Sequence, residues 1–171
     1  MGVFYMTEAE KRQHRCCFTG HRPEKLTSSE WLIKRELERG IRQAMADGLD
    51  VFITGMARGV DIWAAEIVLD LRDAGAPIRL MCASPFEGFE RSWNDEWQRR
   101  YNRIMAAADH TLFVCNGYSR SCFQIRNEWM VNHASRVIAV FNGEKGGTLN
   151  TINYAKRKNV KIINVLEGFD N

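Results

Sequence analysis

The chain has 171 residues, 45% hydrophobic and 26% charged, which is enough apolar content to bury a core without a disulfide or metal staple. Its formal net charge of +3 arises from interspersed charges, a field too weak to indicate a nucleic-acid partner. It shows no signal-peptide pattern and no apolar stretch of the roughly 20 residues that span a bilayer. We therefore expect a cytoplasmic protein without a membrane partner.

The five cysteines form no CxxC pair and have no companion histidine spacing, so we predict neither a disulfide framework nor a metal site. Cys16, Cys17, Cys82 and Cys115 lie in apolar runs, which is typical of buried, reduced thiols. Only Cys122 stands where a reactive thiol could be exposed.

From residue 15 onward, short β-like runs alternate with amphipathic stretches of helical length. Strands are expected over Arg15–Thr19, Val51–Thr54, Ile78–Ala83, Thr111–Cys115, Val137–Phe141 and Lys161–Val165. Helices are expected over Ser28–Ala46, Asp61–Ala74, Ser92–Ala107, Phe123–Ala134 and Leu149–Lys158. This alternation predicts an α/β, Rossmann-like three-layer domain with a mostly parallel sheet of about six strands. We assign residues 1–14 to an N-terminal extension, 15–166 to this single domain and 167–171 to a C-terminal tail.

Ligands of doubly wound sheets bind beyond the carboxyl ends of the strands, so the loops that follow the strands hold the candidate site. The first of these loops carries Thr19, Gly20, His21 and Arg22. The glycine allows close approach of the backbone to a ligand, and Arg22 can pair with a phosphate in a bidentate manner. The alternatives are a loop-capping role for His21 and a surface salt bridge for Arg22.

The second loop, which runs into a helix, holds Gly55, Met56, Arg58, Gly59 and Asp61. Two glycines four residues apart before a helix N-terminus favour an anion at the free backbone amides. Asp61 is either the cap of that helix or a partner for a ribose hydroxyl.

Two later segments complete the candidate ligand site. Gly146, Gly147 and Thr148 precede a helix and suit a second phosphate cradle, with a plain N-cap at Thr148 as the alternative. Arg126 and Asn127 lie in the first turns of another helix. Arg126 is the preferred second cation for a phosphate or carboxylate, and a salt bridge to a neighbouring acid is its alternative.

Phe89, Trp93, Trp97 and Tyr101 follow one another at intervals of four residues and form one stripe on a helix. Such a stripe favours a packed face or a contact between copies in a homo-oligomer over a base-stacking platform.

The motifs Thr19-Gly20-His21-Arg22-Pro23, Gly55-Met56-Ala57-Arg58-Gly59-Val60-Asp61, Arg126-Asn127-Glu128-Trp129-Met130-Val131 and Gly146-Gly147-Thr148 occur in this order. As a set they resemble the YpsA-like branch of the SLOG superfamily over about residues 15–165. The resemblance implies a Rossmann-like bacterial or phage domain that binds or senses a nucleotide-derived small molecule such as NAD, ADP-ribose or a nucleoside monophosphate.

The same resemblance implies two alternatives. LOG-type phosphoribohydrolases carry a PGGxGTxxE motif, but here Leu149, Asn150 and Thr151 follow Thr148 without the glutamate. Whether the chain is an enzyme therefore stays open, with Asp61, Glu87 and Glu128 as candidate carboxylates for N-glycosidic or phosphoester hydrolysis. DprA-type relatives bind single-stranded DNA, which the small net charge disfavours here. Ligand identity, oligomeric state and the role of Cys122 are left open.

Overall fold

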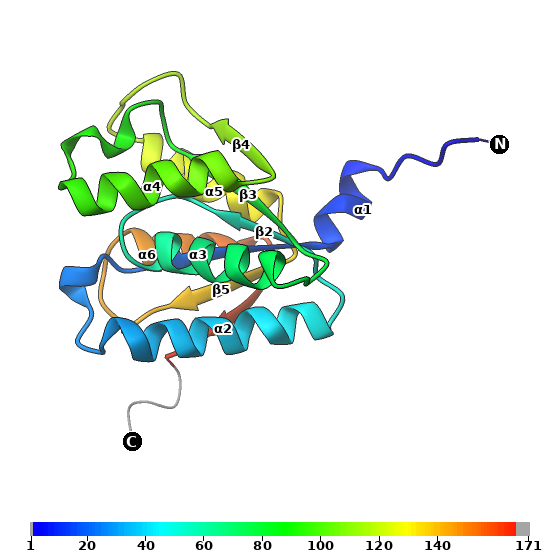
Figure 1. Cartoon of the computed structure of the whole chain (residues 1–171), viewed down its shortest axis with the longest axis horizontal. Helices are drawn as coiled ribbons and strands as arrows, with labels where there is room; N and C mark the ends of the chain where they lie inside the picture. The colour runs from blue at the N-terminus through cyan, green and yellow to red at the C-terminus, as the bar shows by residue number, and fades with distance from the viewer. Residues whose placement is uncertain (1, 167–171) are drawn as a thin grey trace.

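The structure is a computed structural model that describes residues 2–166. The predicted tail, 167–171, lies outside the described residues. Six parallel strands form one sheet in the order β4-β3-β2-β1-β5-β6 (Figure 1). Their bounds are β1 Arg15–Gly20, β2 Val51–Thr54, β3 Arg79–Ser84, β4 His110–Phe113, β5 Arg136–Val140 and β6 Lys161–Asn164.

The order of strands reverses beside β1. The chain steps outward from β1 through β2 and β3 to β4, and then returns to add β5 and β6 on the other side of β1. Parallel neighbours require crossover connections, which the helices supply. The predicted Rossmann-like α/β fold with six strands is confirmed, and the gap between the ends of β1 and β5 is its topological switch point.

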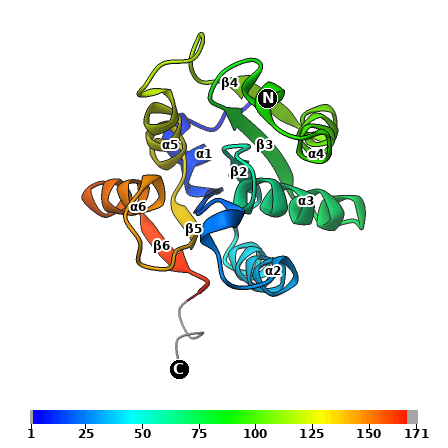
Figure 2. The ribbon, with the colours of Figure 1, turned by 90° about the vertical axis from the view of Figure 1, so that its left-hand side faces the viewer.

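The helices form two layers around the sheet. Their bounds are α1 Glu8–Gln13, α2 Glu30–Ala46, α3 Val60–Asp73, α4 Asp95–Ala107, α5 Cys122–Asn132 and α6 Gly147–Arg157. Helices α2, α3 and α4 cover one face, and α5 and α6 cover the other (Figure 2). Because alternate residues of a strand face opposite layers, Phe18 packs in the larger core under α2–α4 and Cys17 in the smaller one under α5 and α6.

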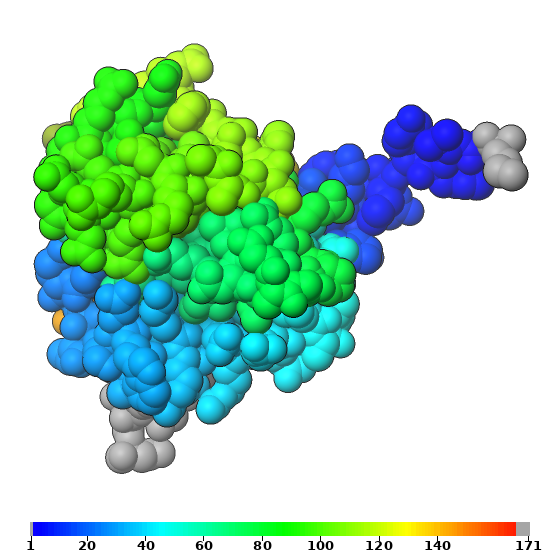
Figure 3. Space-filling model, in the orientation of Figure 1, coloured from blue at the N-terminus to red at the C-terminus, as the bar shows by residue number. Residues whose placement is uncertain are grey.

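Helix starts follow local capping chemistry. The Ser29 hydroxyl accepts a hydrogen bond from the Leu32 amide at 3.3 Å, so α2 begins at Glu30, two residues after the predicted start at Ser28. Thr7 and Glu10 form a capping box that starts α1, a helix within the segment predicted as an extension. Figure 3 shows the face formed by α2, α3 and α4, beside which α1 and the residues before it project.

The aromatic stripe does not lie on one helix. A short 3₁₀ turn, Phe89–Ser92, is followed by extended backbone at Trp93, and Asn94 then caps α4 by accepting a hydrogen bond from the Trp97 amide at 3.0 Å. Tyr101 is buried, and the other three rings pack against the larger core. The stripe is therefore in large part a packed face of the monomer, in which Phe89, Trp93 and Trp97 keep some exposed surface, and a contact between copies there stays a prediction.

The prediction of an exposed thiol at Cys122 is wrong. Its side chain is fully buried at the start of α5, whereas Cys115, predicted to be buried, is the partly exposed cysteine. The cause is the short β4, which ends at Phe113 and leaves Cys115 beyond the ladder. Burial raises the pKa of Cys16 and of Cys82 to about 12.

Candidate functional site

A cavity of about 310 Å³ opens at the carboxyl ends of the strands, the edge that faces the viewer in Figure 2. Its lining comes from β1, from the segments that follow β1, β2 and β3, and from the starts of α3, α5 and α6. The lining residues are Phe18, Thr19, Gly20, Arg22, Lys25, Ala57, Asp61, Phe89, Phe123, Arg126, Asn127, Gly147 and Thr148. The cavity thus lies at the topological switch point, where doubly wound sheets bind their ligands.

The loops that follow β1 and β2 interlock. A Cβ atom at Gly20 would lie 2.5 Å from a methyl carbon of Val60, so the β1 end packs directly on the first turn of α3. Gly59 has a φ of +88°, and a Cβ there would lie 2.8 Å from Cδ of Pro23. These close approaches require glycine at both positions and fix the two loops against each other.

His21 stabilises this arrangement from behind the cavity. The ring is 4% exposed and stacks on Phe141, with 5.5 Å between centroids. Its Nε2 accepts a hydrogen bond from the Asn142 amide at 3.4 Å, which ties the β1 loop to the β5 loop. Burial and the nearby Lys25 lower the pKa of His21, so the ring is neutral near pH 7.

Asp61 and Arg126 face each other across Gly55 on the cavity wall. A Cβ atom at Gly55 would lie 2.9 Å from Asp61 Oδ2 and 3.0 Å from Arg126 Cζ. Asp61 Oδ2 also accepts a hydrogen bond from the Ala57 amide at 3.2 Å. Arg126 donates to the Gly55 carbonyl and, at 2.8 Å, to Oδ1 of Asn127. The Asp61 carboxylate and the Arg126 guanidinium thus both have hydrogen-bond partners within the protein.

Burial is the largest cause of the pKa shifts of Asp61 and Arg126. It raises the pKa of the Asp61 carboxyl, and the Arg126 charge and the Ala57 hydrogen bond oppose that rise. Burial also lowers the pKa of the Arg126 guanidinium, which the Asp61 charge opposes. A carboxyl with a raised pKa on a cavity wall is the property expected of a general acid or base.

Two cations stand at the mouth of the cavity without acidic partners. Within residues 2–166, neither Arg22 nor Lys25 makes an ion pair. The Lys25 ammonium lies 3.5 Å from the position that a Cβ of Gly146 would occupy, beside the first residue of α6. Because a helix N-terminus carries partial positive charge, this ammonium and the α6 dipole repel each other unless an anion lies between them.

Two of the three helices that open onto the cavity begin at glycines, whereas the third, α5, begins after Ser121. Gly59 is the N-cap of α3 and Gly146 the N-cap of α6, and neither helix has a side-chain cap. Asp61 and Thr148, considered as caps from the sequence, instead lie inside the first turns. First-turn amides without a capping side chain are available to a bound anion.

The structure brings eight of the predicted ligand-binding residues onto the cavity wall. They are Thr19, Gly20, Arg22, Asp61, Arg126, Asn127, Gly147 and Thr148. The remaining ones, which shape or support the loops without lining the cavity, are His21, Gly55, Met56, Arg58, Gly59 and Gly146. Met56 is buried with a φ of +64°, and Arg58 pairs with Glu24 at 2.9 Å.

Sequence reasoning missed Lys25, Phe123 and the cavity-facing position of Phe89. Lys25 stands two residues after the end of the first motif, so its place in the loop was a usable signal. Of the three candidate carboxylates, Asp61 lines the cavity, whereas Glu87 is exposed and Glu128 half-buried away from the wall. No group of three or more potential metal ligands occurs among residues 2–166.

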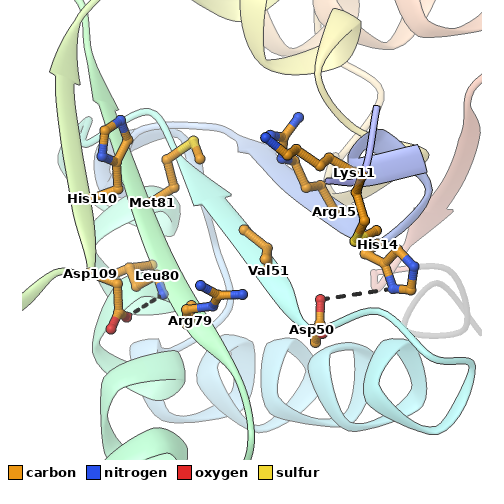
Figure 4. Close-up of a pocket in the computed structure, with 11 residues that line it drawn as sticks. Lys11, His14, Arg15, Asp50, Val51, Arg79, Leu80, Met81, Asp109 and His110 are labelled. Atoms are coloured by element: carbon orange, nitrogen blue, oxygen red, sulfur yellow. Dashed lines mark hydrogen bonds and ion pairs between the residues drawn. The ribbon is translucent and has the colours of Figure 1, made fainter. Parts of the chain in front are cut away.

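A larger cavity, of about 500 Å³, lies at the opposite edge, beside the amino ends of β1 to β4 (Figure 4). Several of its charged groups already have protein partners: Arg15 pairs with Glu8, and Asp109 accepts a hydrogen bond from the Leu80 amide at 2.8 Å. No glycine-capped helix start lines it. The smaller cavity is therefore the better candidate for a ligand site.

Together, the parallel sheet and the cavity at its switch point define a Rossmann-like protein with a candidate ligand site at the carboxyl ends of its strands. The profile of the YspA SLOG family matches residues 16–165, and the chain belongs to this family. No helix within residues 2–166 combines the length and the apolar character needed to cross a membrane.

Several proteins of known sequence are similar to this chain. A UPF0398 protein of Bacillus thuringiensis is 28% identical over 134 residues, which cover 77% of this chain and 73% of the relative. The uncharacterized SPbeta prophage-derived protein YoqJ of Bacillus subtilis is 33% identical over 118 residues, which cover 62% of this chain and 69% of the relative.

Two solved structures share the fold at 18% sequence identity. DNA processing protein A (DprA) of Streptococcus pneumoniae superposes with a TM-score of 0.64 over 88% of this chain and 49% of its own. The Helicobacter pylori protein, whose structure describes a single-stranded DNA binding mode, superposes with a TM-score of 0.63 over 91% and 66%. The chain thus spans about half to two thirds of these DprA chains.

Proposed function

We propose that the carboxyl-edge cavity binds a nucleotide-derived small molecule through its phosphate. The phosphate lies between Arg22, Lys25 and the first amides of α6. An anion at this place relieves the repulsion between the Lys25 ammonium and the helix dipole, and this juxtaposition is the observation that carries the proposal.

The size of the cavity indicates the size of the ligand. About 310 Å³ is at the lower end of the range of roughly 300–1,000 Å³ for small-molecule sites. We therefore favour a nucleoside monophosphate over NAD or ADP-ribose. Arg126 holds the wall in place through Gly55 and Asn127, and Arg22 contacts the phosphate.

Titration calorimetry with AMP, ADP-ribose and NAD tests the proposal. Arg22→Ala is expected to weaken binding by about 10- to 150-fold, the equivalent of one charge-assisted hydrogen bond of about 1.5–3 kcal/mol. Arg103→Ala is the matched control, because Arg103 is an exposed arginine of α4 outside the cavity. Absence of binding to the wild type, or equal binding by Arg22→Ala, would refute the proposal.

A second candidate is hydrolysis of the bound nucleotide, which the buried Asp61 carboxyl favours. Its raised pKa keeps a proton available for a leaving group at higher pH than an ordinary aspartate does. Release of base or phosphate from AMP, followed by chromatography, is the measurement. Asp61→Asn is expected to abolish release while calorimetry still detects binding. If the wild type releases neither product, hydrolysis is refuted and the proposal of binding alone stands.

A third candidate is binding of single-stranded DNA, described for the Helicobacter pylori structure. The shared fold gives no support for the expectation that nucleic acid is excluded. Two exposed cations beside aromatic rings are the local requirement for such binding. Fluorescence anisotropy with an oligothymidylate at several salt concentrations tests it, and binding that weakens steeply with salt would support it.

A further inference from the structure

Four aromatic side chains gather beside the carboxyl-edge cavity, of which Phe89 and Phe123 line it and Phe86 and Tyr118 pack on those two rings. Phe86 and Phe89 come from the connection between β3 and α4, Tyr118 from the loop after β4 and Phe123 from the first turn of α5. Ring centroids are 5.6 Å apart for Phe86–Phe89, 5.5 Å for Phe89–Phe123 and 5.9 Å for Phe86–Tyr118. These four residues are called the aromatic cluster below.

The aromatic cluster and the cations occupy different ends of the cavity. Phe89 and Phe123 line it together with Arg22 and Lys25. The rings follow β3 and β4, whereas the cations and the α6 start follow β1 and β5. In the sheet, β3 and β1, the strand that precedes both cations, are two strand positions apart, a separation of roughly 10 Å at the usual spacing between strands. The site is therefore apolar and planar at one end and cationic at the other.

The aromatic cluster leaves ring surface free. Tyr118 is 72% exposed although it contacts Phe86 and, at 6.3 Å between centroids, Phe123. The angle between the Tyr118 and Phe86 ring planes is 81°, so the two rings meet edge to face and not as a stack. Tyr118 is thus a large exposed ring next to Phe123, a residue that lines the cavity, and such a ring is available to contact a ligand.

We propose that the aromatic cluster is the nucleobase subsite, so that the ligand is a base-bearing mononucleotide held with its base on Tyr118 and Phe123 and its phosphate at Arg22 and Lys25. This inference rests on the proposed function and adds the orientation and chemical class of the ligand. Stacking on aromatic side chains tolerates any base because every base has a π-face. The site therefore selects for the presence of a base and only weakly for its identity.

Calorimetry with AMP and with ribose 5-phosphate, which lacks the base, separates the two ends. Wild type is expected to bind AMP more tightly, and Tyr118→Ala and Phe123→Leu each to weaken AMP by roughly 5- to 150-fold, the range for loss of one stacked base. Both variants keep the wild-type affinity for ribose 5-phosphate. Arg22→Ala weakens both ligands, because both carry the phosphate.

Tyr5→Ala is the matched control, since Tyr5 is 85% exposed and precedes α1, outside this cavity. Quenching of the fluorescence of an etheno derivative of AMP gives a second readout that reports stacking directly, and it is expected in wild type and lost in Tyr118→Ala. Thermal denaturation checks that each variant is folded.

The outcomes distinguish the two proposals. Equal affinity of wild type for AMP and ribose 5-phosphate, or no effect of either aromatic substitution on AMP, overturns the base subsite and leaves the phosphate site standing. Failure of both ligands to bind overturns the proposed function together with this inference. Binding of an oligothymidylate without any binding of AMP also overturns it, in favour of a polymer ligand.

Discussion

Substitution of Gly55 by alanine tests whether the close approach of Asp61 and Arg126 is essential to the fold. Gly55 does not have a positive φ, so alanine fits its backbone. The new Cβ would lie 2.9 Å from Asp61 Oδ2 and 3.0 Å from Arg126 Cζ, closer than ordinary van der Waals contact. Neither group can move without losing its hydrogen bonds to Ala57 or Asn127.

Overpacking of this kind costs about 1–3 kcal/mol in the free energy of unfolding. For a chain of this size, that loss corresponds to a decrease in Tm of roughly 2–12 °C. Urea denaturation gives the free energy, with an unchanged m-value as the check that unfolding is still two-state. The variant should also lose AMP affinity, because the displaced side chains line the cavity.

Gly117→Ala is the matched control. No atom lies within 4 Å of a Cβ at Gly117, and its φ is not positive. This substitution should leave stability unchanged or raise it by up to about 1 kcal/mol, through the lower entropy of the unfolded chain. A Gly55→Ala protein as stable as the Gly117→Ala protein would refute the packing argument for Asp61 and Arg126.

Three further predictions concern other groups. Because the pKa of Asp61 is raised in the folded protein, its contribution to stability is fully present below the unfolded pKa of about 3.9 and is lost as pH rises through the folded pKa. Urea denaturation from pH 3.5 upward should therefore show that the free energy of unfolding of wild type falls relative to that of Asp61→Asn. A difference between the two proteins that stays constant with pH would contradict the prediction. Native protein should expose one thiol to Ellman's reagent, and Cys115→Ser should abolish the reaction, whereas labelling at Cys122 would contradict the burial described. Asn94→Ala should lower the free energy of unfolding by about 0.5–2 kcal/mol, because it removes the side chain that caps α4. An unchanged free energy of unfolding would contradict the presence of this cap hydrogen bond.

The fold was predictable because its signals are local. Each strand is a short apolar run, and each helix start has a nearby cap or glycine, as at Ser29 and Gly59. The same local logic placed Arg22 and Gly147 at one edge of the sheet, where the structure has them. The carboxyl ends of parallel strands lie at the same edge of a sheet, so knowing which segments are strands was enough to place these residues at that edge.

The aromatic cluster could not be predicted, because its members come from segments that only the strand order brings together. Phe86 and Tyr118 are far apart in sequence and meet because β3 and β4 are neighbours. The four-residue spacing from Phe89 to Tyr101 suggested one helix. Asn94 before two acidic residues was the local signal of a new helix start, and it interrupts the stripe.

The interlocked loops after β1 and β2 also determine how the site moves. With Gly20 packed on Val60, and Gly59 on Pro23, this half of the cavity has no independent freedom, so amide hydrogen exchange there should follow the exchange of the sheet. A ligand at the proposed phosphate site would order few further groups there, so little conformational entropy would be lost on that side. The exposed residues 116–121 lack this close packing, as the open space around Gly117 shows, so we expect the amides of the loop that carries Tyr118 to exchange faster than those of the interlocked loops.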